Sequence, residues 1–192
     1  MVLLAAAPFG YAEKADRNKP LNVEADAGRY DDQKRVGTFT GNVVMTKGTL
    51  VMRAGQIEVR QGPEGYQFGV ATAAPGKLAT FRQKRDGVDE TIEGEAERIE
   101  YDGRADTVRF IGRAVIRRYR GGTLADETSG NVISYDNTAE VFNVTGGPTA
   151  ATPANPGGRV RAVITPRDTP PQPEAAASAP PLKPSSALGE AR

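Results

Sequence analysis

The 192-residue sequence contains no cysteine, no histidine and no tryptophan. Without cysteine the chain can form no disulfide, no thiolate metal site and no cysteine nucleophile. Without histidine it lacks the commonest metal ligand and the general base of Ser-His-Asp catalysis. These absences exclude most polar enzyme classes. We therefore expect no enzyme activity, no catalytic residue, no metal site and no cofactor.

The sequence also lacks an excess of charge of one sign. Its 25 basic and 24 acidic side chains leave a formal net charge of +1. Proteins that bind nucleic acid usually carry a clear basic excess. None of the glycine clusters has the spacing of a phosphate-binding or dinucleotide-binding loop. Nucleic acid is therefore not an expected partner.

No apolar run reaches the roughly 20 residues that a membrane-spanning helix needs. Residues 1–12, MVLLAAAPFGYA, carry no charged side chain and end in Gly10-Tyr11-Ala12. This small-x-small ending is typical of a signal-peptide cleavage site, although no basic segment precedes it. We interpret residues 1–12 as a signal-peptide remnant and residues 13–19 as a linker, which predicts a periplasmic or extracellular protein.

Leucine is scarce, with eight residues, whereas valine, isoleucine and threonine number 16, 7 and 16. β-branched side chains are stiff at χ1 and favour strands over helices. With 22 glycines and 14 prolines for turns, the composition predicts an all-β domain. Residues 167–192 consist largely of Pro, Ala and Ser and predict a disordered tail, since they bury too little apolar surface to offset their ordering. The folded domain is expected at residues 20–166.

An internal repeat indicates how this domain is built. Three Tyr-Asp pairs are each followed by a glycine at the same distance, which gives the tyrosine–glycine pairs Tyr30/Gly41, Tyr101/Gly112 and Tyr135/Gly146. Each copy predicts a strand that ends in Tyr-Asp, a polar turn, and a second strand through the glycine. A glycine within a strand indicates a bulge or a tight bend.

The strands through these glycines alternate with a period of two. In the first copy Phe39, Gly41, Val43 and Met45 share one face, and polar residues share the other. The second copy has the same apolar face, with arginines opposite. This alternation is typical of a strand with one buried face.

Further short strands are expected from β-branched runs between turn residues. They lie at residues 21–25, 50–53, 56–60, 66–70, 77–83, 91–93, 96–101, 131–135 and 159–165. A single helical turn could form only at residues 71–74 or 94–98. The first and last strands, 21–25 and 159–165, are expected to be sheet edges.

Two sets of polar residues have competing interpretations. Asp31, Asp102 and Asp136 could act as acid–base groups or Ca²⁺ ligands, but no dense cluster of oxygen ligands surrounds them. We therefore expect them to initiate turns. The run from Arg117 to Arg120 could contact lipid phosphates or an acidic partner. A solvated hairpin tip is the favoured interpretation of this run.

A series of short motifs along the chain is similar to one known family. Its two most specific segments are Phe39-Thr40-Gly41-Asn42-Val43 and Gly76-Lys77-Leu78-Ala79-Thr80-Phe81. The series also contains Val23-Glu24-Ala25-Asp26, Ile92-Glu93-Gly94, Ile99-Glu100-Tyr101 and Phe110-Ile111-Gly112. Over residues 19–166 the series resembles the LptA (OstA-like) family of periplasmic lipopolysaccharide-transport bridge proteins. The spacer at residues 148–158 is longer than this family's usual approach to its last strand.

The resemblance implies an open, twisted antiparallel β-jellyroll with an apolar interior groove. It implies that the groove holds the acyl chains of lipopolysaccharide (lipid A) while the lipid crosses the periplasm. It also implies inner-membrane and outer-membrane partners of the same fold, LptC-like and LptD-like. Pairing between the first edge of one copy and the last edge of another would give self-association into an open, head-to-tail bridge.

Nine apolar side chains are the expected lipid-binding lining of this groove: Leu21, Val23, Phe39, Val43, Met45, Phe81, Tyr101, Phe110 and Ile116. Each of them could equally serve ordinary core packing. Leu21, Val23 and Phe81 favour the ligand because they are expected near an open edge. The alternative function is a structural β filament without a lipid ligand. A polysaccharide-degrading β-solenoid would need a carboxylate cluster on one face.

Overall fold

The computed structural model describes residue 16 and residues 19–62, 64–85, 87–153 and 155–166. The predicted signal-peptide remnant at 1–12 and the predicted tail at 167–192 lie outside the described residues. Of the predicted linker at 13–19, Asp16 and Lys19 are described. Nearly every described element is a β-strand, which confirms the all-β prediction.

The strands are β1 (Leu21–Glu24), β2 (Ala27–Asp31), β3 (Val36–Lys47), β4 (Leu50–Gln61), β5 (Gln67–Thr72), β6 (Ala79–Lys84), β7 (Glu90–Ala96), β8 (Arg98–Asp102), β9 (Thr107–Arg120), β10 (Thr123–Asp136), β11 (Val141–Thr145) and β12 (Arg161–Ile164). A short 3₁₀ helix, η1 (Pro148–Ala150), lies before β12. Within the described part of the chain, no helix has the length and hydropathy needed to cross a membrane.

Two local expectations are wrong. Residues 50–53 and 56–60 form one continuous strand, β4, because both parts pair with β3. The sequence allows a helical turn only at 71–74 or 94–98, yet none forms there, and the 3₁₀ helix η1 forms elsewhere. Ala71 pairs with Ile99, and Gly94 pairs with both Phe81 and Ile116. Hydrogen bonding to neighbouring strands thus overrides the weak local preference for a helical turn.

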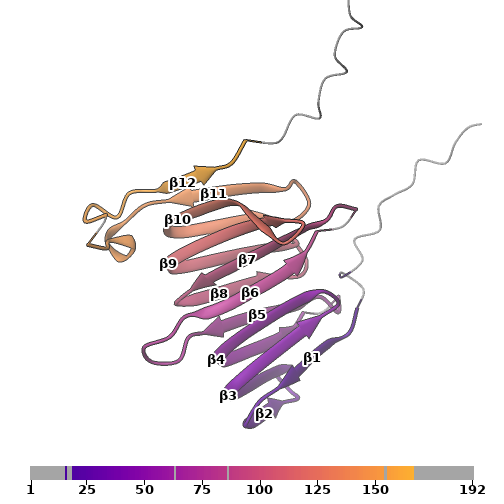
Figure 1. Ribbon diagram of the computed structural model, residues 1–192. Coiled ribbons are helices and arrows are strands. Elements are labelled where there is room, and N and C mark those ends of the chain that lie inside the picture. The colour runs from indigo at the N-terminus through magenta and orange to yellow at the C-terminus, as the bar shows by residue number, and fades with distance from the viewer. Residues whose placement is uncertain (1–15, 17–18, 63, 86, 154, 167–192) are drawn as a thin grey trace, which may run out of the picture.

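The strands form two antiparallel layers that face each other (Figure 1). Along the molecule the strands of both layers follow one another from the end with β1 and β2 to the end with β11 and β12. The first layer contains β2, β5, β8 and β11, and the second layer contains β1, β6, β7 and β12. The long strands β3, β4, β9 and β10 take part in both. For example, β9 pairs with β8 along its first half and with β7 along its second half.

The long strands bend from one layer to the other where the repeat places its glycines. Gly41 has a φ of +78° and Gly112 a φ of +77°, a left-handed conformation that only glycine adopts freely. The pairing register shifts beside both glycines. The predicted bulge is therefore confirmed in two copies. In the third copy, Gly146 follows β11 and does not have a left-handed φ.

Each bend is held by the same contact. Asn42 Nδ2 donates a hydrogen bond to Asp26 Oδ2 at 2.9 Å, and Arg113 Nε donates one to Glu97 Oε1 at 2.9 Å. Asn42 and Arg113 both have a left-handed backbone as well. Asp26 connects β1 of the second layer to β2 of the first, and Glu97 connects β7 of the second layer to β8 of the first. The two copies of the repeat therefore form the same bend with the same supporting contact.

The three aspartates after the repeated tyrosines stabilise hairpin turns. Asp102 Oδ1 accepts hydrogen bonds from the N–H groups of residues 104 and 105 at 2.9 Å each. Asp136 and Asp31 accept equivalent bonds. Each turn ends on a residue with a left-handed φ: Arg35, Asp106 and Glu140. The turn-initiating interpretation of these aspartates is confirmed.

A hydrophobic core fills the space between the layers. Its fully or almost fully buried members include Val43, Met45, Leu50, Met52, Ile57, Phe81, Ile92, Ile99, Tyr101, Val108, Phe110, Ile116, Ile133 and Tyr135. The rings of Phe81 and Phe110 meet edge to face, with centroids 5.5 Å apart. Gly94 makes room for this pair, because a Cβ there would lie 2.3 Å from the Phe110 ring.

Candidate functional site

The two layers are joined along one side and separate along the other. The bends at Gly41 and Gly112 join them along what we call the closed edge. Hairpin turns of both layers lie along the opposite side, which we call the mouth. Among the described residues, the turns lie at 32–35, 62, 64–66, 103–106 and 137–140 in the first layer and at 48–49, 85, 87–89 and 121–122 in the second. The candidate site is the apolar interior between closed edge and mouth.

All nine residues predicted to line the groove belong to one contiguous apolar cluster. Six of them are buried: Val43, Met45, Phe81, Tyr101, Phe110 and Ile116. The other three, Leu21, Val23 and Phe39, are partly buried and pack against the cluster. The expectation that Phe81 lies near an open edge is wrong, because β6 pairs with β4 on one side and β7 on the other.

The interior opens at the end formed by β1 and β2. A cavity of about 240 Å³ lies there, lined by the apolar or aromatic Leu21, Val23, Tyr30, Phe39 and Val59 and by the polar Arg35, Gln61 and Gln67. Tyr30 is 60% exposed, so this end presents an aromatic side chain to solvent. Sequence reasoning missed Tyr30 and Val59. Tyr30 was assigned to the turn motif, and Val59 faces inward only because it lies opposite Gly37.

The other end of the interior is formed by β11 and β12. Phe142 and Val144 of β11 are half-buried and pack against the core. Ile164 of β12 lies opposite the inward-facing Asp126 and so shares the inner face of its layer, yet it is 75% exposed. Among the residues that the structure describes, both ends of the interior therefore leave apolar side chains uncovered.

Each end of the stack also has unpaired strand edges. Within the described ranges, β1 and β2 each pair with β3 alone, and β11 and β12 each pair with β10 alone. The predicted edges at 21–25 and 159–165 are confirmed in β1 and β12. The structure adds a second edge at each end, β2 and β11, so that both layers end in an open strand.

The inner face becomes polar toward the mouth. Lys47 follows Val43 and Met45 on the inner face of β3, as the alternation of that strand requires, and is 6% exposed. Its Nζ donates a hydrogen bond across the mouth to Gln67 Oε1 at 2.8 Å. Burial lowers the pKa of Lys47, and the more distant carboxylates of Asp16 and Asp106 oppose this without cancelling it.

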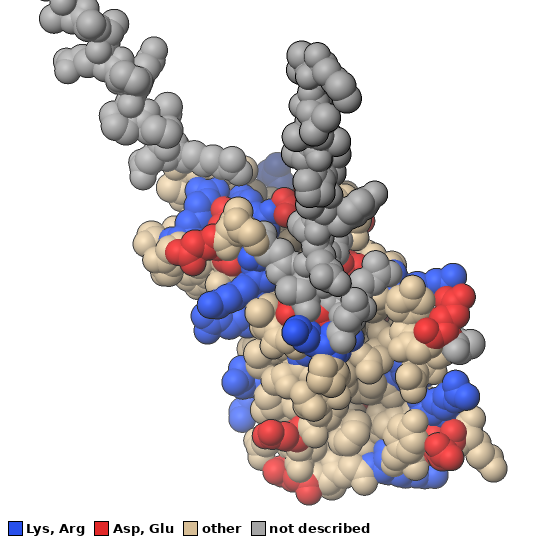
Figure 2. All heavy atoms as spheres, turned by 90° about the vertical axis from the view of Figure 1, so that its right-hand side faces the viewer, with Lys and Arg blue, Asp and Glu red and all other residues tan. Residues whose placement is uncertain are grey.

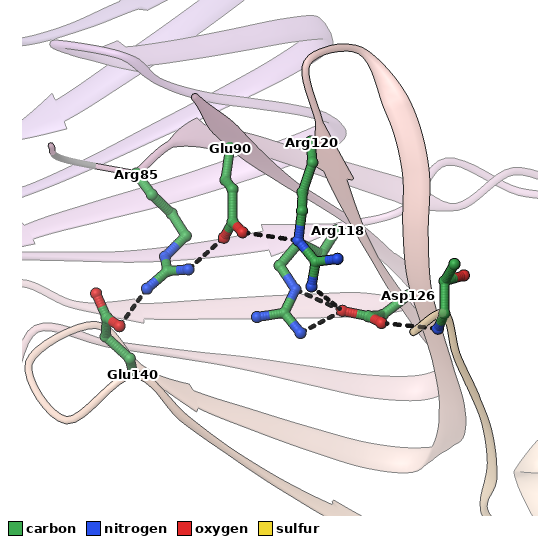
Figure 3. A network of polar contacts seen from close by, with 7 residues as sticks. Arg85, Glu90, Arg118, Arg120, Asp126 and Glu140 are labelled. Atoms are coloured by element: carbon green, nitrogen blue, oxygen red, sulfur yellow. Dashed lines mark hydrogen bonds and ion pairs between the residues drawn. The ribbon is translucent and has the colours of Figure 1, made fainter. Parts of the chain in front are cut away.

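Beyond Ile92 in β7 and Ile116 in β9, the inner side of the mouth carries a row of charged side chains. Figure 3 shows the contacts along this row. In order of contact the row is Glu140, Arg85, Glu90, Arg120, Asp126 and Arg118. Glu90 accepts from Arg85 and, at 3.0 Å, from Arg120 Nε. Burial alone would raise the pKa of Glu90, but these two hydrogen bonds, together with the positive charges of Arg85 and Arg118, outweigh it and lower the pKa.

The hairpin tip lies at Gly121-Gly122, as expected, but the interpretation of the arginine run as solvated is wrong. Residues 117–120 belong to β9 and are half-buried. Arg118 and Arg120 point inward and join the charged row. Arg117 points outward and pairs with Glu127 at 2.8 Å. The alternation that buries Phe110 and Ile116 continues through the run and divides it between the two faces of β9.

The outer surface carries charge of both signs. On the face drawn in Figure 2, basic and acidic groups lie next to one another rather than in a patch of one sign. Charged residues on the outer faces of the strands also form cross-strand pairs, such as Arg109 with Glu100 at 3.2 Å. The described residues contain no group of three or more His, Cys, Asp or Glu side chains that could hold a metal ion. The interior itself has apolar walls and a charged rim at the mouth, an arrangement that suits an amphiphile.

The chain is similar to lipopolysaccharide export proteins. It is 37% identical over 100 residues to the lipopolysaccharide export system protein LptA of Escherichia coli (strain K12), a match that covers 52% of this chain and 53% of that protein. It is 34% identical over 102 residues to the LptA of Haemophilus influenzae, covering 53% and 58%. The chain thus spans about half the length of the curated relatives that it matches.

A solved structure supports the same relationship. The crystal structure of LptH from Pseudomonas aeruginosa, described as the LptA homologous periplasmic component of the lipopolysaccharide transport device, matches with a TM-score of 0.65 and 25% sequence identity. The match covers 79% of this chain and 99% of that one. The β-jellyroll predicted from the resemblance is thereby confirmed. The family of LptA and the LptD N-terminal domain matches residues 22–141, more than half of the chain, and the protein belongs to this family of LPS transport proteins.

Proposed function

We propose that this protein binds lipopolysaccharide through its acyl chains and carries it across the periplasm, from the inner to the outer membrane, as part of a head-to-tail bridge. One observation carries the proposal: an apolar interior runs the length of the stack, is uncovered at both ends, and has a charged rim. Membership of the family supports it. The lipid contacts are the nine interior residues together with Tyr30 and Val59 at the open end.

The energetics of lipid transfer explain why such an interior is needed. Exposing one CH₂ group to water costs about 0.8 kcal/mol, so a twelve-carbon chain costs roughly 10 kcal/mol. A lipid with several chains faces a barrier of tens of kcal/mol in open water, which diffusion does not cross at a useful rate. A continuous apolar path removes most of this cost without any chemical step.

The strand directions at the two ends support end-to-end assembly. β1 runs from the mouth toward the closed edge, and β12 runs from the closed edge toward the mouth. β2 and β11 likewise run in opposite directions in the first layer. A second copy stacked in the same orientation would therefore join both layers through antiparallel pairs, as in the rest of the sheet. Such a contact is heterologous and extends without closing.

The same edges would receive the partners at either membrane. An inner-membrane component and an outer-membrane component of the same fold, LptC-like and LptD-like, each need one open end of this stack. Because the two ends differ in sequence, each partner has its own end.

Photo-crosslinking in intact cells tests the proposal. A photoreactive residue placed at Val23 or Phe110, which face the interior, should give an adduct with lipopolysaccharide. The matched controls are Asn22 beside Val23 and Arg109 beside Phe110, exposed neighbours of the two test residues on the same strands. If the folded periplasmic protein gave no adduct at the interior positions, or gave it equally at the controls, lipid transport would be wrong and a ligand-free filament would be the better account.

A further inference from the structure

The interior of this structure is filled by its own side chains. Phe81 and Phe110 are at most 2% exposed, and the cavity at the β1 end, about 240 Å³, is smaller than most ligand sites. On the proposed function, the two layers must move apart at the mouth when an acyl chain enters. The contacts that hold the mouth closed are then part of the binding mechanism.

The side-chain contacts that cross the mouth between described residues include Lys47 with Gln67 and Arg85 with Glu140. Lys47 donates to the neutral amide of Gln67 at 2.8 Å. Arg85, just beyond β6 in the second layer, forms an ion pair with Glu140 in the β10–β11 turn of the first layer. The second contact joins opposite charges, so opening the mouth there deprives Arg85 of one of its two anionic partners and leaves it only Glu90.

The charged row shows why Arg85 needs that anion. The second layer alone contributes three arginines to the row, at 85, 118 and 120, and two carboxylates, Glu90 and Asp126. One positive charge is left over without Glu140. The Arg85 side chain is only 15% exposed, and a largely buried guanidinium is costly unless it is paired.

Glu140 is the exchangeable member of the row. Its side chain is 57% exposed at a hairpin tip, whereas those of Glu90 and Asp126 are 12% and 11% exposed. A cavity of about 710 Å³ lies beside the row, lined by Arg85, Glu90 and Arg120 and by apolar residues that include Val88 and Leu124. An anionic group could therefore approach Arg85 from this cavity.

We propose that Arg85 binds a phosphate on the headgroup of the amphiphile whose chains enter the interior, and that Glu140 occupies this position while the interior is empty. A planar guanidinium binds phosphate through paired hydrogen bonds. The phosphate displaces Glu140, so the mouth is released while Arg85 remains paired. This inference rests on the proposed function.

The test compares the binding of diphosphoryl lipid A and of its dephosphorylated form to the full chain. The variants are Arg85→Gln, Glu140→Gln and the control Arg82→Gln. Arg82 lies on the same part of the chain but on the outer face, where it is 3.6 Å from Glu93. Thermal unfolding of each variant reports whether it is folded. If Arg85→Gln does not fold, Arg85→Lys replaces it, because lysine keeps the charge without the bidentate geometry.

The wild type should bind the phosphorylated lipid about tenfold more tightly than the dephosphorylated one, the value of one hydrogen-bonded charge pair. Arg85→Gln should abolish this preference, and Arg85→Lys should reduce it. Glu140→Gln should strengthen the binding of both lipids by a similar factor, because the mouth opens more easily, and should keep the preference. Arg82→Gln should match the wild type.

Other results would overturn the inference. Equal binding of both lipids by the wild type, or an unchanged preference in Arg85→Gln, refutes it and leaves the proposed function intact. Binding of neither lipid refutes the proposed function itself. Inorganic phosphate is the third ligand. If it raises the melting temperature through Arg85 while the two lipids bind equally, the residue binds free phosphate and the headgroup assignment is wrong.

Discussion

The bend at Gly112 offers a direct test of how the two layers are held at their angle. Its φ of +77° is left-handed, and a Cβ placed there would lie 2.4 Å from Glu97 Oε2 and 2.9 Å from its Cδ. Alanine in this conformation costs roughly 1–2 kcal/mol from the backbone alone. The collision must also displace Glu97 from its 2.9 Å contact with Arg113, which adds up to about 1 kcal/mol.

Gly112→Ala should therefore lower the free energy of unfolding by about 2 kcal/mol. For a chain of this size that corresponds to a fall in melting temperature of roughly 4–8 °C. Gly76→Ala is the matched control, because Gly76 has a φ of +73° with nothing within 4 Å of its added Cβ. Both variants change the unfolded chain equally, so their difference isolates the steric contact at the bend.

Urea and thermal unfolding of both variants, alone and in a Glu97→Ala background, measure this difference. In the Glu97→Ala background, Gly112→Ala should lower the free energy of unfolding by only about as much as Gly76→Ala does, because the carboxylate that collides with the added Cβ is gone. Equal losses for the two single variants would refute the reasoning. So would a Gly112→Ala loss that Glu97→Ala leaves unchanged.

Three further predictions concern stability. Phe110→Ala should lower the free energy of unfolding by about 3–5 kcal/mol, because the side chain is fully buried against Phe81. Arg109→Ala, on the exposed face, should lower it by no more than about 1 kcal/mol, and urea unfolding compares the two variants. Asp102→Ala should cost about 1 kcal/mol, because it leaves two turn N–H groups without their acceptor, and hydrogen exchange at residues 104 and 105 should quicken. The lowered pKa of Glu90 stabilises the fold above the ordinary carboxyl pKa of about 4.3, and this stability is lost as the pH falls through the folded value. Thermal unfolding between about pH 6 and pH 3 should therefore show a shallower decline for Glu90→Gln than for the wild type.

Local signals predicted the parts of the fold that depend on a few neighbouring residues. The Tyr-Asp motif predicted three hairpins, because an aspartate that bonds its own turn needs no distant partner. The glycines predicted bends, since the left-handed conformation at Gly41 and Gly112 is a property of one residue. The alternation around Phe39 and Phe110 predicted which side chains would meet in the interior.

Features that depend on pairing between distant strands could not be read in this way. The alternation of β9 points Arg118 and Arg120 inward. It does not show that β7 and β10, the strands on either side, bring Glu90 and Asp126 beside them. The contact of Arg85 with Glu140 joins two turns on opposite layers, which no local pattern relates.

Any head-to-tail contact must also pair the edge strands so that the inward-facing side chains of both copies lie on the same face. In β1, Leu21 and Val23 face the interior, and in β12, Ala162 and Ile164 share the inner face. An edge pair in which Val23 met Val163 would turn apolar side chains of one copy outward and interrupt the interior.

The chain has no cysteine, so single cysteines can test directly which residues of the two edge strands lie opposite each other. Mixed copies carrying Val23→Cys and either Ala162→Cys or Ile164→Cys should form an intermolecular disulfide, because their side chains share a face within bonding reach. Val23→Cys with Val163→Cys should not, and equally efficient bonding in that pair would mean that the two copies do not share a continuous interior.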